Sequence, residues 1–211
     1  ADSDEANVPR DRRARFNVVQ NACDSVHSRL TKNRPRPWVV TSGGSASTQQ
    51  RAKQLNKYME GEFSRMKIYP LASTCGMDGE IFGTGALKIY ASNGRPKAER
   101  VDIAELLVDP LEAETKDVRT LYQVKQIDRG VLRQMFPESD KAIADVSRVE
   151  TRGDGADDPI VSDMIQVLEA WHLRSGPEAK DGRHVICIDT GTLFEERWEA
   201  EAFPFAFFKW S

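Results

Sequence analysis

The spacing of apolar residues changes along the chain, and this change constrains the fold more than any other feature of the sequence. In the N-terminal third, apolar side chains recur every three or four residues, as at Val19, Cys23, Val26 and Leu30. This period predicts amphipathic helices over residues 10–31 and 48–66. Thr48 is the expected N-cap of the second helix, because its hydroxyl can accept a hydrogen bond from the first helical turn.

The last third of the chain alternates apolar and polar residues between turns that contain glycine. Strands are predicted there over residues 164–173, 183–189, 193–198 and 205–210. The first three are expected to form an antiparallel meander, because short turns join them. The last contains most of the five aromatic residues between Phe203 and Trp210, a composition that is typical of a strand buried on both faces. We expect this segment either to enter the core or to lead into further protein.

The middle of the chain is expected to mix the two kinds of element. A third helix is predicted over residues 71–82 and is ended by Gly83-Thr84-Gly85. A hairpin with strands over residues 86–91 and 100–108 follows, since Asn-Gly favours a tight turn. Farther on, a strand over residues 119–127 leads into a short helix that Asp128 caps. The sequence therefore predicts an α+β fold, with N-terminal helices followed by mixed and antiparallel strands.

A chain of 211 residues is long enough to bury a core without disulfide or metal staples. We expect two parts, an N-terminal helical segment over residues 1–70 and an α+β domain over residues 71–211. No apolar stretch approaches the eighteen residues that a membrane-spanning helix needs. The acidic residues 1–5 lack the apolar core of a signal peptide, and an intracellular origin is expected from the cysteine usage.

Charge is unevenly distributed along the chain. The formal net charge is −3, which excludes a uniformly basic nucleic-acid binder. Residues 10–36 nevertheless hold eight Lys and Arg against two acids, and residues 99–117 hold seven acids against two bases. Such asymmetry is typical of surfaces that meet complementary partners. We expect the arginines of the basic segment to contact a neighbouring subunit or DNA: Arg10, Arg12, Arg13, Arg15, Arg29, Arg34 and Arg36.

Few residues in the sequence have the spacing of a catalytic or ligand-binding site. The step Gly83-Thr84-Gly85 has a helix before it and a strand after it, which favours a turn over a dinucleotide-binding loop. His172 and His184 lie on adjacent predicted strands, but their spacing is only weak evidence for a metal site. Cys23 and Cys187 have apolar neighbours and are expected in the core. We therefore expect no catalytic residue, no metal and no cofactor.

Several segments, in the same order, resemble the wing region of tailed-bacteriophage portal proteins. The resemblance is carried by a strand with Glu169-Ala170-Trp171-His172, a hairpin with Asp181-Gly182-Arg183-His184, and a strand with Phe203-Pro204-Phe205 that ends in Trp210-Ser211. Upstream segments agree in order. These are residues 119–137, 83–89 and 33–37.

This resemblance implies a structural role and no enzymatic activity. Portal subunits form a closed ring, usually of twelve, at one vertex of the capsid in the virion, and double-stranded DNA passes through the ring without sequence-specific contacts. The implied partners are other copies of the subunit, the major capsid protein, the terminase motor, and head-completion or adaptor proteins. No membrane is involved. The stem, clip and crown of the family have no counterpart in this chain, so it resembles the N-terminal part of a portal.

Two other classes of protein remain open at this point. A metal-dependent nuclease would need converging acids or histidines, and the two strand histidines are its best feature. A capsid or tail adaptor would share the α+β organisation but would be a complete domain. A continuation of the gene into long helices after Ser211 would favour the portal.

Overall fold

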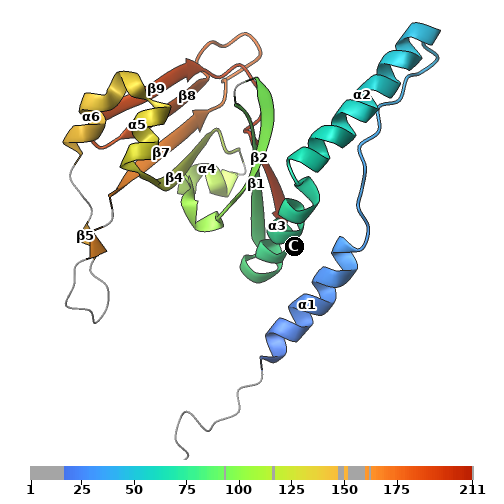
Figure 1. The fold of residues 1–211 in the computed structure, drawn as a ribbon, viewed down its shortest axis with the longest axis horizontal. Coiled ribbons are helices and arrows are strands. Elements are labelled where there is room, and N and C mark those ends of the chain that lie inside the picture. Colours follow the sequence, from blue (N-terminus) through green and yellow to red (C-terminus); the bar gives the residue numbers. More distant parts are fainter. Residues whose placement is uncertain are drawn as a thin grey trace, which may run out of the picture. The chain divides into compact units, whose positions relative to one another are not determined.

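The computed structural model describes residues 17–92, 94–115, 117–146, 150–151, 160–161 and 163–210. The fold is α+β, as the sequence predicts (Figure 1). Contacts between residues divide the chain into two compact units. Unit 1 comprises Ala1–Leu87, Ala91–Arg100 and Phe207–Ser211, and unit 2 comprises Lys88–Tyr90 and Val101–Ala206. Residue 70, the expected end of the helical segment, lies inside a helix of unit 1.

Unit 1 begins with the helices α1 (Val18–Thr31), α2 (Ala46–Arg65) and α3 (Ile68–Phe82). Asn17 caps α1 by accepting a hydrogen bond from the backbone N–H of Gln20. The cap of α2 is Ser45, whose hydroxyl accepts from the N–H of Thr48. The prediction of Thr48 as the cap is therefore wrong, because the helix begins one turn earlier.

Glycine allows the abrupt change from α3 to the strand β1 (Thr84–Ser92). Gly83 has a φ of 83°, in the left-handed region that ends many helices. Two residues later the backbone passes so close to α3 that a Cβ on Gly85 would lie 1.9 Å from the carbonyl oxygen of Cys75. The sequence motif is thus a helix-to-strand step, as predicted.

A three-stranded sheet has the order β10–β1–β2, with β2 over Arg95–Val101 and β10 over Phe205–Lys209. Trp210 N–H donates to Gly83 and Ile89 N–H donates to Pro204, so β10 runs antiparallel to β1. β10 is an edge strand on which Phe207 and Phe208 remain partly exposed. Of the two alternatives stated for this segment, entry of the whole strand into the core is therefore wrong.

The predicted return strand over residues 100–108 is also wrong, because it merges two elements. β2 starts earlier and ends at Val101. A 3-10 turn at Ile103–Glu105, capped by Asp102, then separates it from β3 (Leu106–Val108), which belongs to the other sheet. Alternation alone cannot reveal this break, because Val101, Ile103 and Leu107 keep the period of a strand across it.

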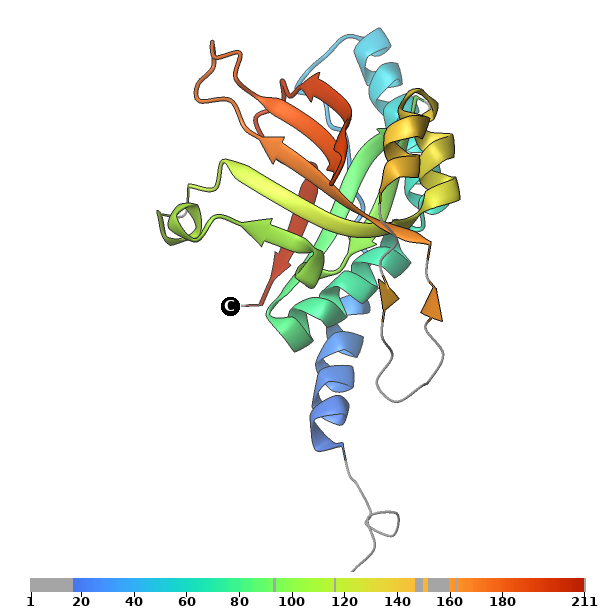
Figure 2. The same ribbon diagram turned by 90° about the vertical axis from the view of Figure 1, so that its left-hand side faces the viewer.

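Unit 2 is built on a five-stranded antiparallel sheet with the order β3–β4–β7–β8–β9. Its strands after β3 are β4 (Thr120–Asp128), β7 (Met164–His172), β8 (Arg183–Ile188) and β9 (Gly191–Arg197). The predicted meander is β7–β8–β9 (Figure 2). The pairing of β8 with β9 shifts register between Ile186 and Cys187. The short strands β5 (Glu150–Thr151) and β6 (Ile160–Val161) pair separately, and the rest of the loop expected over residues 151–159 lies outside the described residues.

Short helices cover part of one face of this sheet (Figure 1). They are α5 (Arg129–Met135) and α6 (Asp140–Asp145), which a 3-10 turn at Pro137–Ser139 joins. A further short helix, α4 (Pro110–Thr115), lies between β3 and β4 in the sequence. Asp128 caps α5 as predicted. The core of unit 2 forms where α5 and α6 meet the sheet, and contains Leu132, Ile143, Ile165, Val167 and Ile188. None of the helices among the described residues is long and apolar enough to cross a membrane.

Candidate functional site

Side chains from several of the motifs quoted above meet in the interior of unit 2. Glu169 and Trp171 are two residues apart on β7 and point to the same face of the sheet. His184 of β8 pairs with Trp171, so its ring lies on that face as well. Phe205 contacts Trp171 edge-on, with 5.1 Å between the ring centroids. Together with Lys88 of β1, we call these residues the buried cluster.

One carboxylate holds two cationic side chains in the buried cluster. Oε1 of Glu169 lies 2.9 Å from Nε2 of His184, and its other oxygen accepts a hydrogen bond from Lys88. The second ring nitrogen of His184 lies 2.9 Å from a carboxylate oxygen of Glu196. The ammonium of Lys88 lies 4.5 Å from the centre of the Trp171 ring, within the range of a cation–π interaction.

Both members of the central pair have shifted pKa values. Burial alone would raise the pKa of Glu169, but the hydrogen bond from His184 and the charge of Lys88 bring it below its ordinary value. Burial opposes the charged form of His184, yet its hydrogen bonds to Glu169 and Glu196 raise the pKa of the imidazole. Both shifts favour the ionised network.

The buried cluster is better suited to structure than to chemistry. Both ring nitrogens of His184 and both oxygens of Glu169 have partners inside the protein. A general base needs a nitrogen or oxygen within hydrogen-bond reach of a substrate. The cluster instead ties Lys88 to β7 and β8 through a satisfied polar network, which fixes the local register.

The two strand histidines do not form a pair. His172 lies next to Trp171 in the sequence, so its side chain points to the face opposite His184. Its Nδ1 atom lies 2.8 Å from the hydroxyl oxygen of Thr120. Within the part of the chain that the structure describes, no group of three or more His, Cys, Asp or Glu side chains could hold a metal ion.

A second polar network links α1 to α3 in unit 1. Nε2 of His27 lies 2.9 Å from the hydroxyl of Ser73, and its Nδ1 lies 3.3 Å from Oε1 of Glu80. The contacts connect a serine, a histidine and a glutamate in the way that a hydrolase triad does. Ser73 lies inside α3, however, where the surrounding N–H groups donate to helical carbonyls and cannot stabilise an oxyanion. The network therefore joins the two helices.

The three cysteines are free thiols. Cys75 is buried, donates to the carbonyl of Ala86 at 3.2 Å, and has a pKa that burial raises. A raised pKa disfavours the reactive thiolate. Cys23 and Cys187 are only half-buried, so the expectation that both lie in the core is wrong.

The structure places only part of the predicted arginine set. Arg10, Arg12, Arg13 and Arg15 lie outside the described residues. Arg29 lies in the last turn of α1, where its charge faces the negative end of the helix dipole. Arg34 and Arg36 follow α1 on an extended segment and line a groove along α2.

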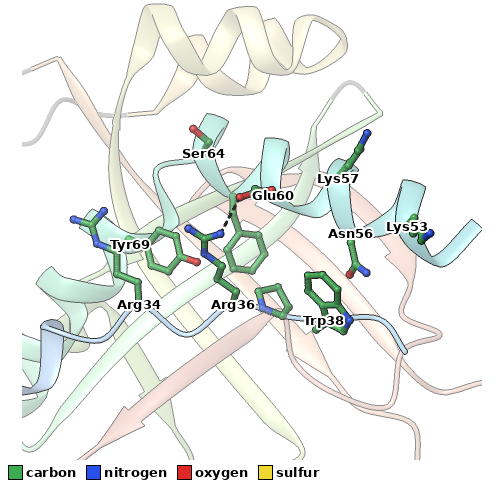
Figure 3. Close-up of a pocket in the computed structure, with 11 residues that line it drawn as sticks. Arg34, Arg36, Trp38, Lys53, Asn56, Lys57, Glu60, Ser64 and Tyr69 are labelled. Atoms are coloured by element: carbon green, nitrogen blue, oxygen red, sulfur yellow. Dashed lines mark hydrogen bonds and ion pairs between the residues drawn. The ribbon is translucent and has the colours of Figure 1, made fainter. Parts of the chain in front are cut away.

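This groove has a volume of about 510 Å³ and is lined by the extended segment, by α2 and by Tyr69 of α3, all in unit 1. Figure 3 shows Arg34 beside the ring of Tyr69 and Arg36 directed at Glu60. The Arg36–Glu60 ion pair measures 3.2 Å, and the guanidinium of Arg34 lies 5.8 Å from the Tyr69 ring centre. Asn56 anchors the extended segment to α2 through two hydrogen bonds with the backbone of Val39.

Four cations and one carboxylate line the groove. Lys53 and Lys57 of α2 join Arg34 and Arg36, and Glu60 is the acid. Trp38 lines the groove too, although its side chain is 73% exposed. We call this site the cationic groove. Sequence reasoning missed both lysines, although residues 29–67 contain nine Lys and Arg and two Glu, a pattern that could have pointed to α2.

The acidic segment over residues 99–117 is largely engaged in local structure. Asp102 caps the 3-10 turn, and Asp109 accepts from the N–H of Leu111 at 2.8 Å. Glu112 accepts from the N–H groups of Arg119 and Thr120, which lowers its pKa. These carboxylates stabilise turns and are poorly available to a partner.

The first two helices of unit 1 bury little of their surface. None of the residues of α1 is buried, and Ala52 is the one buried residue of α2. Large apolar side chains on these helices and the segment between them are instead exposed: Val18, Val19, Trp38, Val40, Leu55 and Tyr58. Isolated helices of this length are marginal in water, and most helical stability comes from packing of an apolar face.

No family model matches the chain, and a comparison with the curated proteins found no match.

Proposed function

We propose that this chain is a structural subunit of a tailed-bacteriophage portal ring, located at the capsid vertex of the virion. The observation that carries the proposal is the unburied surface of α1 and α2. Exposed apolar side chains in such number mark a surface that other chains cover. A ring supplies that cover through contacts between different patches of neighbouring subunits.

The buried cluster supports the same proposal. Glu169, Trp171, His184 and Phe205 come from three separate motifs on which the portal resemblance depends, and they contact one another in the interior. Motifs that meet in a core are what a shared fold requires, whereas motifs scattered over a surface would favour chance similarity. Because the cluster is structural, it also favours an assembling subunit over a nuclease.

The remaining features of the proposal come from the resemblance. In a portal, the subunit meets other copies, the major capsid protein, and the terminase motor followed by head-completion proteins. Double-stranded DNA is packaged and released through the ring. A capsid or tail adaptor is the second candidate, since exposed apolar helices would suit it equally.

Electron microscopy of the purified gene product that contains this chain tests the proposal. We expect closed rings with a central channel. Leu55→Asp with Tyr58→Asp should reduce ring formation, because both side chains are exposed on α2. Val131→Asp with Met135→Asp is the matched control, since these apolar residues are exposed on α5. Particles that are only monomers or dimers would contradict the portal and favour the adaptor.

A further inference from the structure

We propose that the cationic groove of one subunit receives the α4 segment of a neighbouring copy, in particular Leu111, Glu114 and Asp117. The α4 segment is α4 together with the two residues that follow it, residues 110–117. This inference rests on the proposed ring, for which it names a subunit contact. The cationic side of this contact comes from the extended segment and α2, and its acidic side comes from the end of the acidic segment over residues 99–117.

The groove has the composition of a protein-binding site. Trp, Tyr and Arg are the residues that dominate the binding energy of protein interfaces, and Trp38, Tyr69 and Arg34 all line it. Two hydrogen bonds between the side chain of Asn56 and the backbone of Val39 hold the extended segment against α2, so the groove is preformed. A preformed site loses less conformational entropy on binding.

The electrostatics of the groove favour an acidic occupant. Arg36 is paired with Glu60. The structure shows no such ion pair for the other three cations of the lining, among the described residues: Arg34, Lys53 and Lys57. A segment with two carboxylates would complement this excess charge, and charge complementarity selects partner and orientation.

The α4 segment is held in a shape that suits insertion. Asp109 caps its first turn, and Glu112 accepts hydrogen bonds from the N–H groups of Arg119 and Thr120 at 2.9 Å each. These contacts fix the segment at both ends. They leave Leu111 72% exposed, with Glu114 and Asp117 also exposed. The segment thus offers one apolar side chain and two carboxylates.

A ring requires this kind of asymmetry. Each subunit of a closed ring uses one patch toward one neighbour and a different patch toward the other. The cationic groove and the α4 segment are different patches with opposite charge. A single nucleic-acid strand could also use cations and an exposed Trp. The apolar side chains of Pro37 and Phe63 also line the groove, and they favour a protein occupant.

Charge reversal and rescue test the contact in the complete gene product. We expect Lys53→Glu with Lys57→Glu to weaken ring assembly by more than about tenfold, because like charges would face each other. Adding Glu114→Lys and Asp117→Lys to the same chain should restore the rings. The matched control is Lys141→Glu with Lys180→Glu, which makes the same charge change at exposed lysines of unit 2. Circular dichroism confirms that each variant is folded.

A second measurement addresses the apolar half of the contact. Trp38→Ala and Leu111→Ala should each weaken assembly, and the double variant should be no weaker than the worse single variant, because the two residues share one interaction. Fully additive effects would count against a direct contact.

The outcomes separate this inference from the proposed function. If the wild-type protein forms no rings, the proposed function fails. Rings that persist in the Lys53/Lys57 variant, or that are lost and not restored by the reversed acids, overturn the α4 contact while the portal proposal stands. If the lysine variant instead loses binding of a fluorescent single-stranded oligonucleotide and retains its rings, the groove is a nucleic-acid site.

Discussion

Trp171 and His184 stack face to face across β7 and β8, with 5.2 Å between ring centroids and 7° between ring planes. The stacking places the imidazole where Glu169 and Glu196 both reach it. A buried histidine that is held by two carboxylates stabilises the fold most when it is charged.

The stability of the protein should therefore depend on pH through His184. The hydrogen bonds to Glu169 and Glu196 raise the pKa of this group above its ordinary value of 6.5 in the folded state. Its stabilising effect is then fully present below pH 6.5 and is lost as the pH rises through the folded pKa. Urea unfolding measures the free energy of unfolding of the wild-type protein and of His184→Gln. The wild-type protein should be more stable than the variant by a larger margin at pH 5.5 than at pH 9. An equal difference at both pH values would show that His184 is not charged in the fold.

Replacement of Lys88 by Met should be strongly destabilising. The change leaves Glu169 with one cationic partner in a buried site, and breaking a buried ion pair costs about 3–5 kcal/mol. Chemical denaturation at pH 7 measures the loss. Lys97→Met removes a lysine from an exposed position on β2 and should change stability by less than about 0.5 kcal/mol. A similar effect for both variants would refute the buried pair.

Gly85→Ala should prevent the close approach of β1 to α3. The new Cβ would meet the Cys75 carbonyl oxygen at 1.9 Å, so the backbone must move. We expect a loss of more than about 3 kcal/mol or failure to fold. The control is Gly61→Ala on α2. A Cβ at this position would have no neighbouring atom within 4 Å, so the change should stabilise the helix by up to about 1 kcal/mol. Thermal unfolding of the two alanine variants compares them directly, and equal melting temperatures would contradict the packing.

Arg129→Lys should destabilise unit 2 although it keeps the charge. The guanidinium of Arg129 donates to the carbonyl groups of Ile143, Ala144 and Val146 at the end of α6, and to Asp163. A lysine cannot reach this set of acceptors from one planar group, so buried carbonyls lose partners at about 1–3 kcal/mol. Arg183→Lys at an exposed ion pair is the control and should have little effect. Urea unfolding distinguishes the two, and no difference between them would refute the role of Arg129.

Local signals in the sequence predicted much of the fold. The α+β class, the meander β7–β8–β9 and the cap at Asp128 all follow from periodicity and turn chemistry. The errors have physical causes. The predicted strand over residues 100–108 failed because alternation continues across a 3-10 turn. Entry of the whole of β10 into the core, one of the two alternatives for this segment, failed because a run of aromatic residues does not reveal which strand lies at a sheet edge.

The candidate sites were less accessible to sequence reasoning. Arg34 and Arg36 were predicted as contact residues, but Lys53 and Lys57 reach the same groove only because the extended segment folds back along α2. The buried cluster joins residues far apart in the chain, since Lys88 and Glu169 meet only in the folded protein. No spacing rule links such residues in a single sequence.

The position of β10 beside β1 determines when the protein can fold during its synthesis. The central strand of the three-stranded sheet, β1, leaves the ribosome long before its edge partner β10, because residues 93–204 are made between the two. Until β10 emerges, one edge of β1 has no partner strand from this sheet and is open to pairing with other chains. Folding of this sheet is therefore limited by a contact between distant parts of the chain, which makes it slow and vulnerable to aggregation. A chain whose synthesis stops before residue 205 lacks β10. Such a chain can complete unit 1 only if a strand of another molecule pairs with the open edge of β1.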